Sequence, residues 1–217
     1  MAVHLMRELE KLKLMLFELC ETVQEDVSTT VKALLKKDVS LAKKVINNDE
    51  KIDAREVEIE EECLKALALF QPVAIDLRFI VAVLKLNSDL ERIGDLAVNI
   101  AETVLLLSNE KEIEEPFNVE NMSERVMRMV SLSLQALVDL NSVLASEVLE
   151  MDRAVDAAHR KNYTTIANKI REDVDNIEGY IGFLSISRNL ERMADHATNI
   201  AEDIIYMVKG NIIRHKT

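Results

Sequence analysis

The chain has 217 residues, a formal net charge of −12 at pH 7, only four glycines and two prolines, and few aromatic side chains. This acidic charge argues against nucleic acid as the main partner, because the negatively charged phosphate backbone binds basic protein surfaces. The scarcity of helix-breaking residues, together with abundant Leu, Ala, Glu, Lys and Met, predicts long helices around an aliphatic core.

No uncharged stretch approaches the roughly 18 apolar residues that a membrane span needs, so no direct membrane insertion is expected. The N-terminus is amphipathic and carries glutamates, which suits neither a signal peptide nor a transit peptide. A cytoplasmic location is therefore expected. Cys20 and Cys63 have no C-x-x-C spacing, and we expect two reduced, buried thiols.

Three helices are predicted in the first half of the chain. Apolar residues at three- and four-residue steps indicate an amphipathic helix that runs to about Lys36 and is broken near Lys37-Asp38. A second helix is predicted from about Ser40 to Phe70. Pro72 fits the first turn of a third helix, where its missing N–H costs nothing, and this helix runs to about Ser108. The inner stripe of the second helix consists of Val45, Ile52, Ile59, Cys63, Ala66 and Phe70.

Residues 109–118 are polar and acidic and contain the only other proline, which predicts a boundary between a first unit, 1–112, and a second unit, 113–217. The pattern then restarts. A fourth helix is marked by apolar residues between 122 and 144, a fifth runs from Met151 to about Arg171, and a sixth from Asp175 to about Lys209. The predicted fold is all-α: two tandem three-helix bundles made of six long helices, related by an internal repeat.

The clearest sign of the repeat lies in the third and sixth predicted helices. Residues 89–102 (DLERIGDLAVNIAE) return as residues 189–202 (NLERMADHATNIAE), with nine of fourteen positions identical. The repeated pattern E-x-x-x-D-x-x-x-N places its polar residues on one helix face, because each spacing is close to a whole turn. The second and fifth helices carry the pattern D-x-x-x-D, offset by 103 residues. In an antiparallel hairpin these stripes can face each other, which gathers acidic side chains between two helices of each half.

Two interpretations of these stripes compete. Charged helix faces are usually solvated, and the Arg92–Asp95 spacing offers an ion pair of only about 0.2–0.5 kcal/mol. Against this, facing carboxylates repel one another strongly where they are partly buried, and a divalent or trivalent cation would offset that repulsion. Asp, Glu and Asn oxygens suit Mg²⁺, Ca²⁺, Mn²⁺ or oxidised iron. Zinc would normally come with more His or Cys, and His159 is either a nitrogen ligand in the second half or a surface residue.

The chain lacks a G-x-x-x-x-G-K-[ST] phosphate loop, a G-x-G-x-x-G fingerprint and an H-E-x-x-H motif. A ferritin-like di-iron enzyme needs two Glu-x-x-His pairs, and only Asp156-Ala-Ala-His159 comes near. The alternative function therefore left open is a carboxylate-bridged metalloenzyme, either a hydrolase or a di-iron oxidase.

The run QPVAIDLRFIVAVLKLNSDLERIGDLAVNIAE (71–102) and its second copy NLERMADHATNIAED resemble the signature of the PhoU family of phosphate-uptake regulators. The resemblance spans essentially the whole chain as two repeats. It implies an all-α fold of two similar three-helix bundles, and iron or zinc clusters held by the repeated acidic motifs. Carried over to this sequence, the metal ligands that the resemblance implies are Asp49, Asp53, Glu91 and Asp95 in the first half and Asp152, Asp156, Glu191 and Asp195 in the second, with Asn99 and Asn199 as supporting residues. The second half lacks an equivalent of Gln71-Pro72 and of Asp76-Leu77-Arg78, so its site need not match the first.

The resemblance further implies a negative regulator that is not an enzyme. Such a protein would couple a phosphate ABC transporter, through its ATPase subunit, to a sensor histidine kinase. A homodimer is left open, with methionines such as Met122, Met127 and Met129 assigned either to its interface or to the core.

Overall fold

The computed structural model describes residues 2–110 and 113–209. Over these residues the chain forms long α-helices with one short 3₁₀ segment. The elements are α1 (Ala2–Lys36), α2 (Val39–Phe70), α3 (Ala74–Leu107), α4 (Val119–Asp139), α5 (Ser142–Glu172), η1 (Val174–Asn176) and α6 (Ile177–Lys209).

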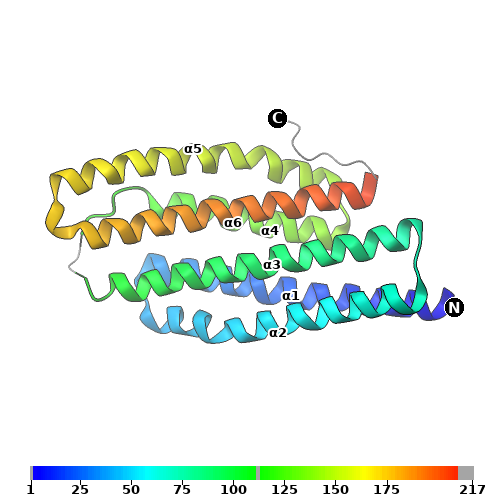
Figure 1. Cartoon of the computed structure of the whole chain (residues 1–217). Helices are drawn as coiled ribbons and strands as arrows, with labels where there is room; N and C mark the ends of the chain where they lie inside the picture. The colour runs from blue at the N-terminus through cyan, green and yellow to red at the C-terminus, as the bar shows by residue number, and fades with distance from the viewer. Residues whose placement is uncertain (1, 111–112, 210–217) are drawn as a thin grey trace.

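The helices form two three-helix bundles that lie side by side, so the predicted all-α repeat fold is confirmed. Helices α1–α3 make one bundle and α4–α6 the other, and α3 and α6 run along each other at the centre (Figure 1). The molecule is elongated, because all six helices run roughly along the same direction (Figure 1).

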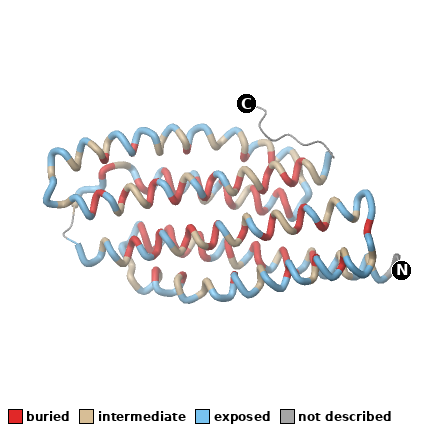
Figure 2. The backbone as a smooth tube through the Cα atoms, in the orientation of Figure 1, coloured by how far each residue is buried: buried red, intermediate tan, exposed pale blue. Residues whose placement is uncertain are grey.

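A continuous aliphatic core extends through both bundles. Its members come from all six helices, and the buried positions line the inward faces of α3 and α6 in particular (Figure 2). The predicted inner stripe of α2 is buried from Val45 to Ala66, and Phe70 is half-buried. Met122 and Met129 are buried in the core rather than exposed.

Cys20 and Cys63 are buried and free. Loss of hydration on burial is the first cause that raises the pKa of each thiol to about 12, so both stay protonated at neutral pH. The expectation of two buried thiols outside a disulfide is confirmed.

The first turn of each bundle has the same construction. Lys37 and Leu140 each adopt a left-handed backbone (φ 53° and 48°) at the end of the preceding helix. The next residue then caps the following helix: the side chain of Asp38 accepts from the backbone N–H of Ser40 and Leu41, and Asn141 does the same for Val143 and Leu144.

The predicted helix boundaries are wrong at two junctions, the one between α4 and α5 and the one between α2 and α3. The prediction carried α4 through to position 144 and started α5 at Met151, whereas α4 ends at Asp139 and α5 begins at Ser142. The helix breaks at Leu140, which has a left-handed backbone. Such positions are usually occupied by glycine, so a leucine there does not mark the break in the sequence. Pro72 was placed in the first turn of the third helix, but that helix begins only at Ala74, and Pro72 lies in the preceding turn.

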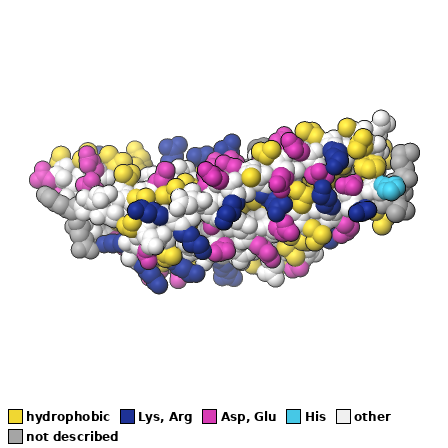
Figure 3. Space-filling view, turned by 90° about the horizontal axis from the view of Figure 1, so that it is seen from below, with side chains coloured by type: hydrophobic (Ala, Val, Ile, Leu, Met, Phe, Trp, Pro, Cys, Tyr) yellow, Lys and Arg dark blue, Asp and Glu magenta, His cyan; other side chains and the backbone are white. Residues whose placement is uncertain are grey.

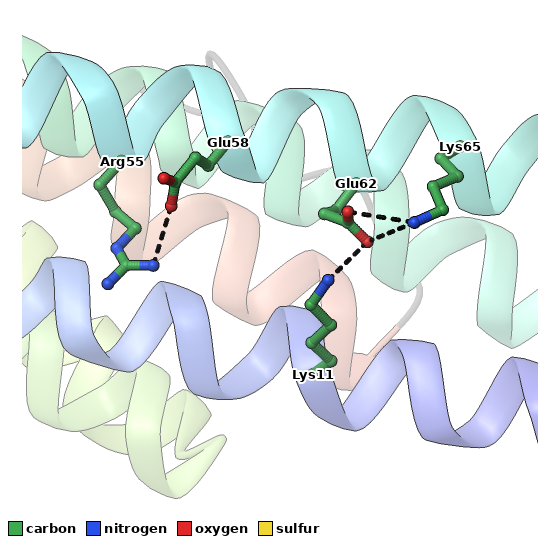
Figure 4. Close-up of polar contacts among 5 residues, drawn as sticks. All are labelled: Lys11, Arg55, Glu58, Glu62 and Lys65. Atoms are coloured by element: carbon green, nitrogen blue, oxygen red, sulfur yellow. Dashed lines mark hydrogen bonds and ion pairs between the residues drawn. The ribbon is translucent and has the colours of Figure 1, made fainter.

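Ion pairs tie α1 to α2 on the outer surface of the first bundle. Lys11 Nζ lies 2.8 Å from Glu62 Oε2, and Glu62 also pairs with Lys65, while Arg55 Nη1 pairs with Glu58 (Figure 4). On this side both signs of charge are interspersed (Figure 3). The net acidity is therefore not gathered into one acidic face on this side.

The predicted boundary between 112 and 113 falls at residues 111–112, which lie outside the described residues, and it stays a prediction. The described helices flank it, with α3 ending at Leu107 and α4 beginning at Val119. None of the helices in the described ranges has a stretch apolar and long enough to cross a bilayer.

Two candidate metal centres

Each bundle gathers three aspartates from the facing sides of its second and third helices. Asp49 and Asp53 on α2 meet Asp95 on α3, and carboxylate oxygens of all three lie within 4.8 Å of one another. The second bundle repeats the arrangement with its own triad, Asp152 and Asp156 on α5 and Asp195 on α6, within the same distance. Six of the eight carboxylates selected from the sequence are thus brought together, three in each cleft.

Close helix approach brings these carboxylates together. A Cβ built on Gly94 would lie 3.1 Å from Ile52 Cδ1, so α2 and α3 nearly touch beside Asp53 and Asp95. At the equivalent positions the second bundle has Val155 and Ala194. Ile52 with Gly94 and Val155 with Ala194 differ only in which helix carries one carbon, which predicts a similar helix spacing in both hairpins.

The first cleft penalises ionisation of its carboxyls. The pKa of Asp49 is raised, first by burial and then by the charges of Asp53 and Asp95. The pKa of Glu91 is also raised, first by burial and then by Asp95, although Arg92 acts in the opposite direction. Arg92 lies on the rim, where its Nη1 pairs with Asp95 Oδ2 at 2.8 Å.

The second cleft shows the same effect. Burial, followed by the charges of Asp156 and Asp195, raises the pKa of Asp152 to about 6. The pKa of Asp195 is raised by burial, then by Glu191 and Asp156. Near neutral pH each cleft therefore holds several negative charges that the fold itself disfavours.

A carboxylate oxygen in each cleft has no hydrogen-bond donor. Asp49 Oδ1 and Asp152 Oδ1 are both buried and unpaired, and they occupy equivalent positions in the two repeats. A buried, unpaired carboxylate oxygen is costly unless something positive meets it. The possible metal-ligand atoms next to each of these oxygens are carboxylate oxygens of the same triad. Divalent and trivalent cations prefer such oxygen ligands. The residues present therefore fit a bound metal.

The other four predicted residues lie outside the two triads. Glu91 is half-buried, and the charge of Asp95 in the first triad contributes to its raised pKa. In the second bundle the charge of Glu191 contributes to the raised pKa of Asp195. Asn99 is exposed. Asn199 turns its amide nitrogen to Asp89 on α3, 3.2 Å away, and so contributes to the contact between the two bundles.

Two residues near the clefts differ from what the sequence suggested. Asp26 on α1 was missed: it is buried, accepts both amide contacts of Asn48 at 2.9 and 3.0 Å, and contributes to the raised pKa of Asp49. The only sequence signal for the burial of Asp26 was its position directly before the core residue Val27. His196 lies one residue off the acidic stripe in the sequence, which predicts an exposed side chain. In the structure only 18% of its side chain is exposed, and its Nδ1 lies 2.8 Å from Asp89 at the α3–α6 contact.

Comparison with known proteins identifies close relatives over nearly the full chain. The family model described as PhoU domain matches residues 16–104 and 119–204, one match in each bundle. A protein of Aquifex aeolicus described as a phosphate-specific transport system accessory protein PhoU homolog is 39% identical over 212 residues, 98% of this chain and 96% of that protein. A Thermotoga maritima protein, described as homolog 1 of the same accessory protein, is 34% identical over 96% of this chain and 90% of its own length.

Solved structures agree with the described fold. The crystal structure of PhoU from Pseudomonas aeruginosa superimposes with a TM-score of 0.90 at 35% identity, covering 94% of this chain and 99% of that one. The phosphate transport system regulatory protein PhoU from Streptococcus pneumoniae gives 0.84 at 30% identity, covering 96% and 99%. The Aquifex aeolicus, Thermotoga maritima and Streptococcus pneumoniae proteins are described as accessory or regulatory proteins.

Proposed function

The chain belongs to the PhoU family, and on that premise we propose that it is a metal-binding negative regulator of phosphate uptake and not an enzyme. The names of its relatives support the regulatory role, since they are accessory and regulatory proteins of phosphate transport. The observation that supports metal binding is the pair of equivalent triads, each with one buried carboxylate oxygen that has no donor.

Metal ions bound in the two clefts would stabilise the α2–α3 and α5–α6 hairpins. Each ion would neutralise carboxylates whose ionisation the fold disfavours, and it would link the two helices that supply those carboxylates. Iron or zinc clusters are the metals that we propose. The all-oxygen triads also suit Mg²⁺, Mn²⁺ or Ca²⁺.

The proposed partners are the ATPase subunit of a phosphate ABC transporter and a sensor histidine kinase, which the chain would link in the cytoplasm. The net charge of −12 suits docking on basic protein surfaces.

A double substitution tests the metal assignment. Asp95→Ala with Asp195→Ala removes one triad member from each cleft on the third helix of each bundle. We expect metal content, measured by elemental analysis of tag-free protein, to drop sharply while the far-ultraviolet helical signal is kept. Glu58→Ala with Glu150→Ala removes two exposed acids from α2 and α5 outside the triads and serves as the matched control. Equal metal content in both variants would refute the assignment.

A second experiment tests the regulatory role. Deleting the gene in its host should switch on phosphate-starvation genes in phosphate-rich medium, and the wild-type chain should restore repression. The chain should also co-purify with the transporter ATPase and with the kinase. Repression that persists in the deletion strain would contradict the proposed role.

A further inference from the structure

The second cleft continues beyond its aspartates to a histidine. His159 follows Asp152 and Asp156 on α5 by seven and three residues, so the three share one helix face. Its Nδ1 lies 3.0 Å from Ser187 Oγ on α6, and Ser187 precedes Glu191 by one turn. The imidazole is therefore held across the α5–α6 cleft, one turn beyond the level of Asp156.

A buried polar network orients this imidazole. Ser187 Oγ accepts a hydrogen bond from Asn162 Nδ2 at 3.1 Å and donates to Met122 Sδ at 3.7 Å. A serine oxygen has two lone pairs, so Ser187 can also accept from the Nδ1–H of His159, which is the tautomer that a metal ion on Nε2 requires. In that tautomer Nε2 keeps its lone pair. Metal-binding histidines are commonly held in this way, with one ring N–H donated to the protein and the other nitrogen on the metal.

The equivalent position in the first bundle faces the acidic cleft. Glu56 stands there, at the same spacing from Asp49 and Asp53. Its pKa is raised, first by burial and then by Glu60 and Asp53, and Glu56 in turn contributes to the raised pKa of Glu91. The second bundle thus has a nitrogen donor at a position where the first has a carboxylate.

We propose that His159 provides a nitrogen ligand, through Nε2, to a metal ion at the Asp156–Glu191 end of the second cleft. The two centres would then differ in preference. A mixed nitrogen and oxygen set favours Zn²⁺ and similar borderline ions, whereas the all-oxygen first cleft favours harder cations. This inference rests on the proposed metal-binding function and adds a specificity-determining residue to it.

X-ray absorption on zinc-loaded, full-length protein tests this ligand directly. The first triad is disabled by Asp49→Asn with Asp53→Asn, so that Zn²⁺ binds in the second cleft alone. We expect the outer-shell scattering of an imidazole in this protein and its loss when His159→Gln is added. Zinc affinity should fall by about tenfold or more with His159→Gln, and by about tenfold with Ser187→Ala, because the serine orients the ring.

The matched control is the reciprocal variant, in which Asp152→Asn with Asp156→Asn disables the second triad, so that Zn²⁺ binds in the first cleft. Its zinc should show oxygen scattering only, and Glu56→His should introduce the imidazole signal there. Zinc bound in the second cleft with oxygen scattering alone would overturn the histidine ligand and leave the proposed function intact. A folded protein, checked by circular dichroism, that binds no zinc in the second cleft would overturn that metal centre and the ligand with it.

Discussion

Replacing Asp152 by asparagine is expected to change thermal stability in opposite directions with and without metal. In the metal-free protein the pKa of Asp152 is raised from 3.8 to about 6, first by burial and then by the charges of Asp156 and Asp195. Above that pH the folded chain must carry an ionised carboxylate in a place that disfavours it. A neutral asparagine of the same shape removes this cost, so the metal-free variant should be more stable than the wild type.

The raised pKa sets the size of the effect. At about 1.4 kcal/mol per pH unit it corresponds to about 3 kcal/mol. The side chain is only half-buried, and screening by water reduces the gain to about 1–1.5 kcal/mol. For a chain of this length each kcal/mol moves the Tm by about 2–4 °C, so the metal-free variant should melt roughly 3–5 °C higher.

The sign of the pH dependence follows from the same shift. Because the pKa is higher in the folded chain, the folded state binds more protons than the unfolded state between the ordinary value of 3.8 and about 6. Wild-type stability from this group therefore falls as pH rises through that window. Below the window the carboxyl is protonated in both states, and the advantage of Asp152→Asn should disappear.

With metal bound the order reverses, because the variant has lost a ligand and gains less stability from the ion. The assay is thermal unfolding by circular dichroism at pH 7.5, with EDTA and with Zn²⁺ or Mn²⁺. Glu150→Gln, which removes an exposed charge from the same helix outside the triad, is the control and should not show the reversal. A metal-free Asp152→Asn protein that melts at or below the wild-type temperature would refute the electrostatic reasoning.

Three further experiments test the packing and connection of the helices, each measured by denaturant unfolding. Gly94→Ala and Ile52→Val, which together give the first bundle the pair found in the second, should be non-additive, with a favourable coupling of about 1 kcal/mol, and simple additivity would contradict the proposed close approach. Leu140→Gly should stabilise the chain by about 1 kcal/mol, because the left-handed backbone there costs a leucine but not a glycine. Asp89→Ala should cost about 1–3 kcal/mol by removing the acceptor of the His196 ring between α3 and α6, and an unchanged midpoint would show that this contact contributes nothing.

Much of the fold is predictable from the sequence because hydrophobic periodicity is strong over long helices. The stripe from Val45 to Ala66 predicts the buried face of α2 residue by residue. The helix break at Leu140 was missed because residues 139–142 include no glycine or proline. The offset of 103 residues between the two repeats does predict this break, because it places Leu140-Asn141 at the position equivalent to Lys37-Asp38, where the first helix ends.

The candidate sites are predictable only in part, for a related reason. Spacing along one helix places Asp49 with Asp53, but the choice of the facing carboxylate depends on how two helices dock. Asp95 joins the triad, whereas Glu91 adjoins it. His196 illustrates the same limit, since its burial is set by the packing of α6 on α3, about which helical periodicity within one bundle says nothing.

Anomalous X-ray diffraction from crystals of the full chain, purified without tag or chelator, tests metal binding most directly. Strong peaks are expected between the three aspartates of each hairpin, with one beside Asp49 Oδ1 and one beside Asp152 Oδ1. Both clefts filled by water alone, with the carboxylates arranged as described, would contradict the account.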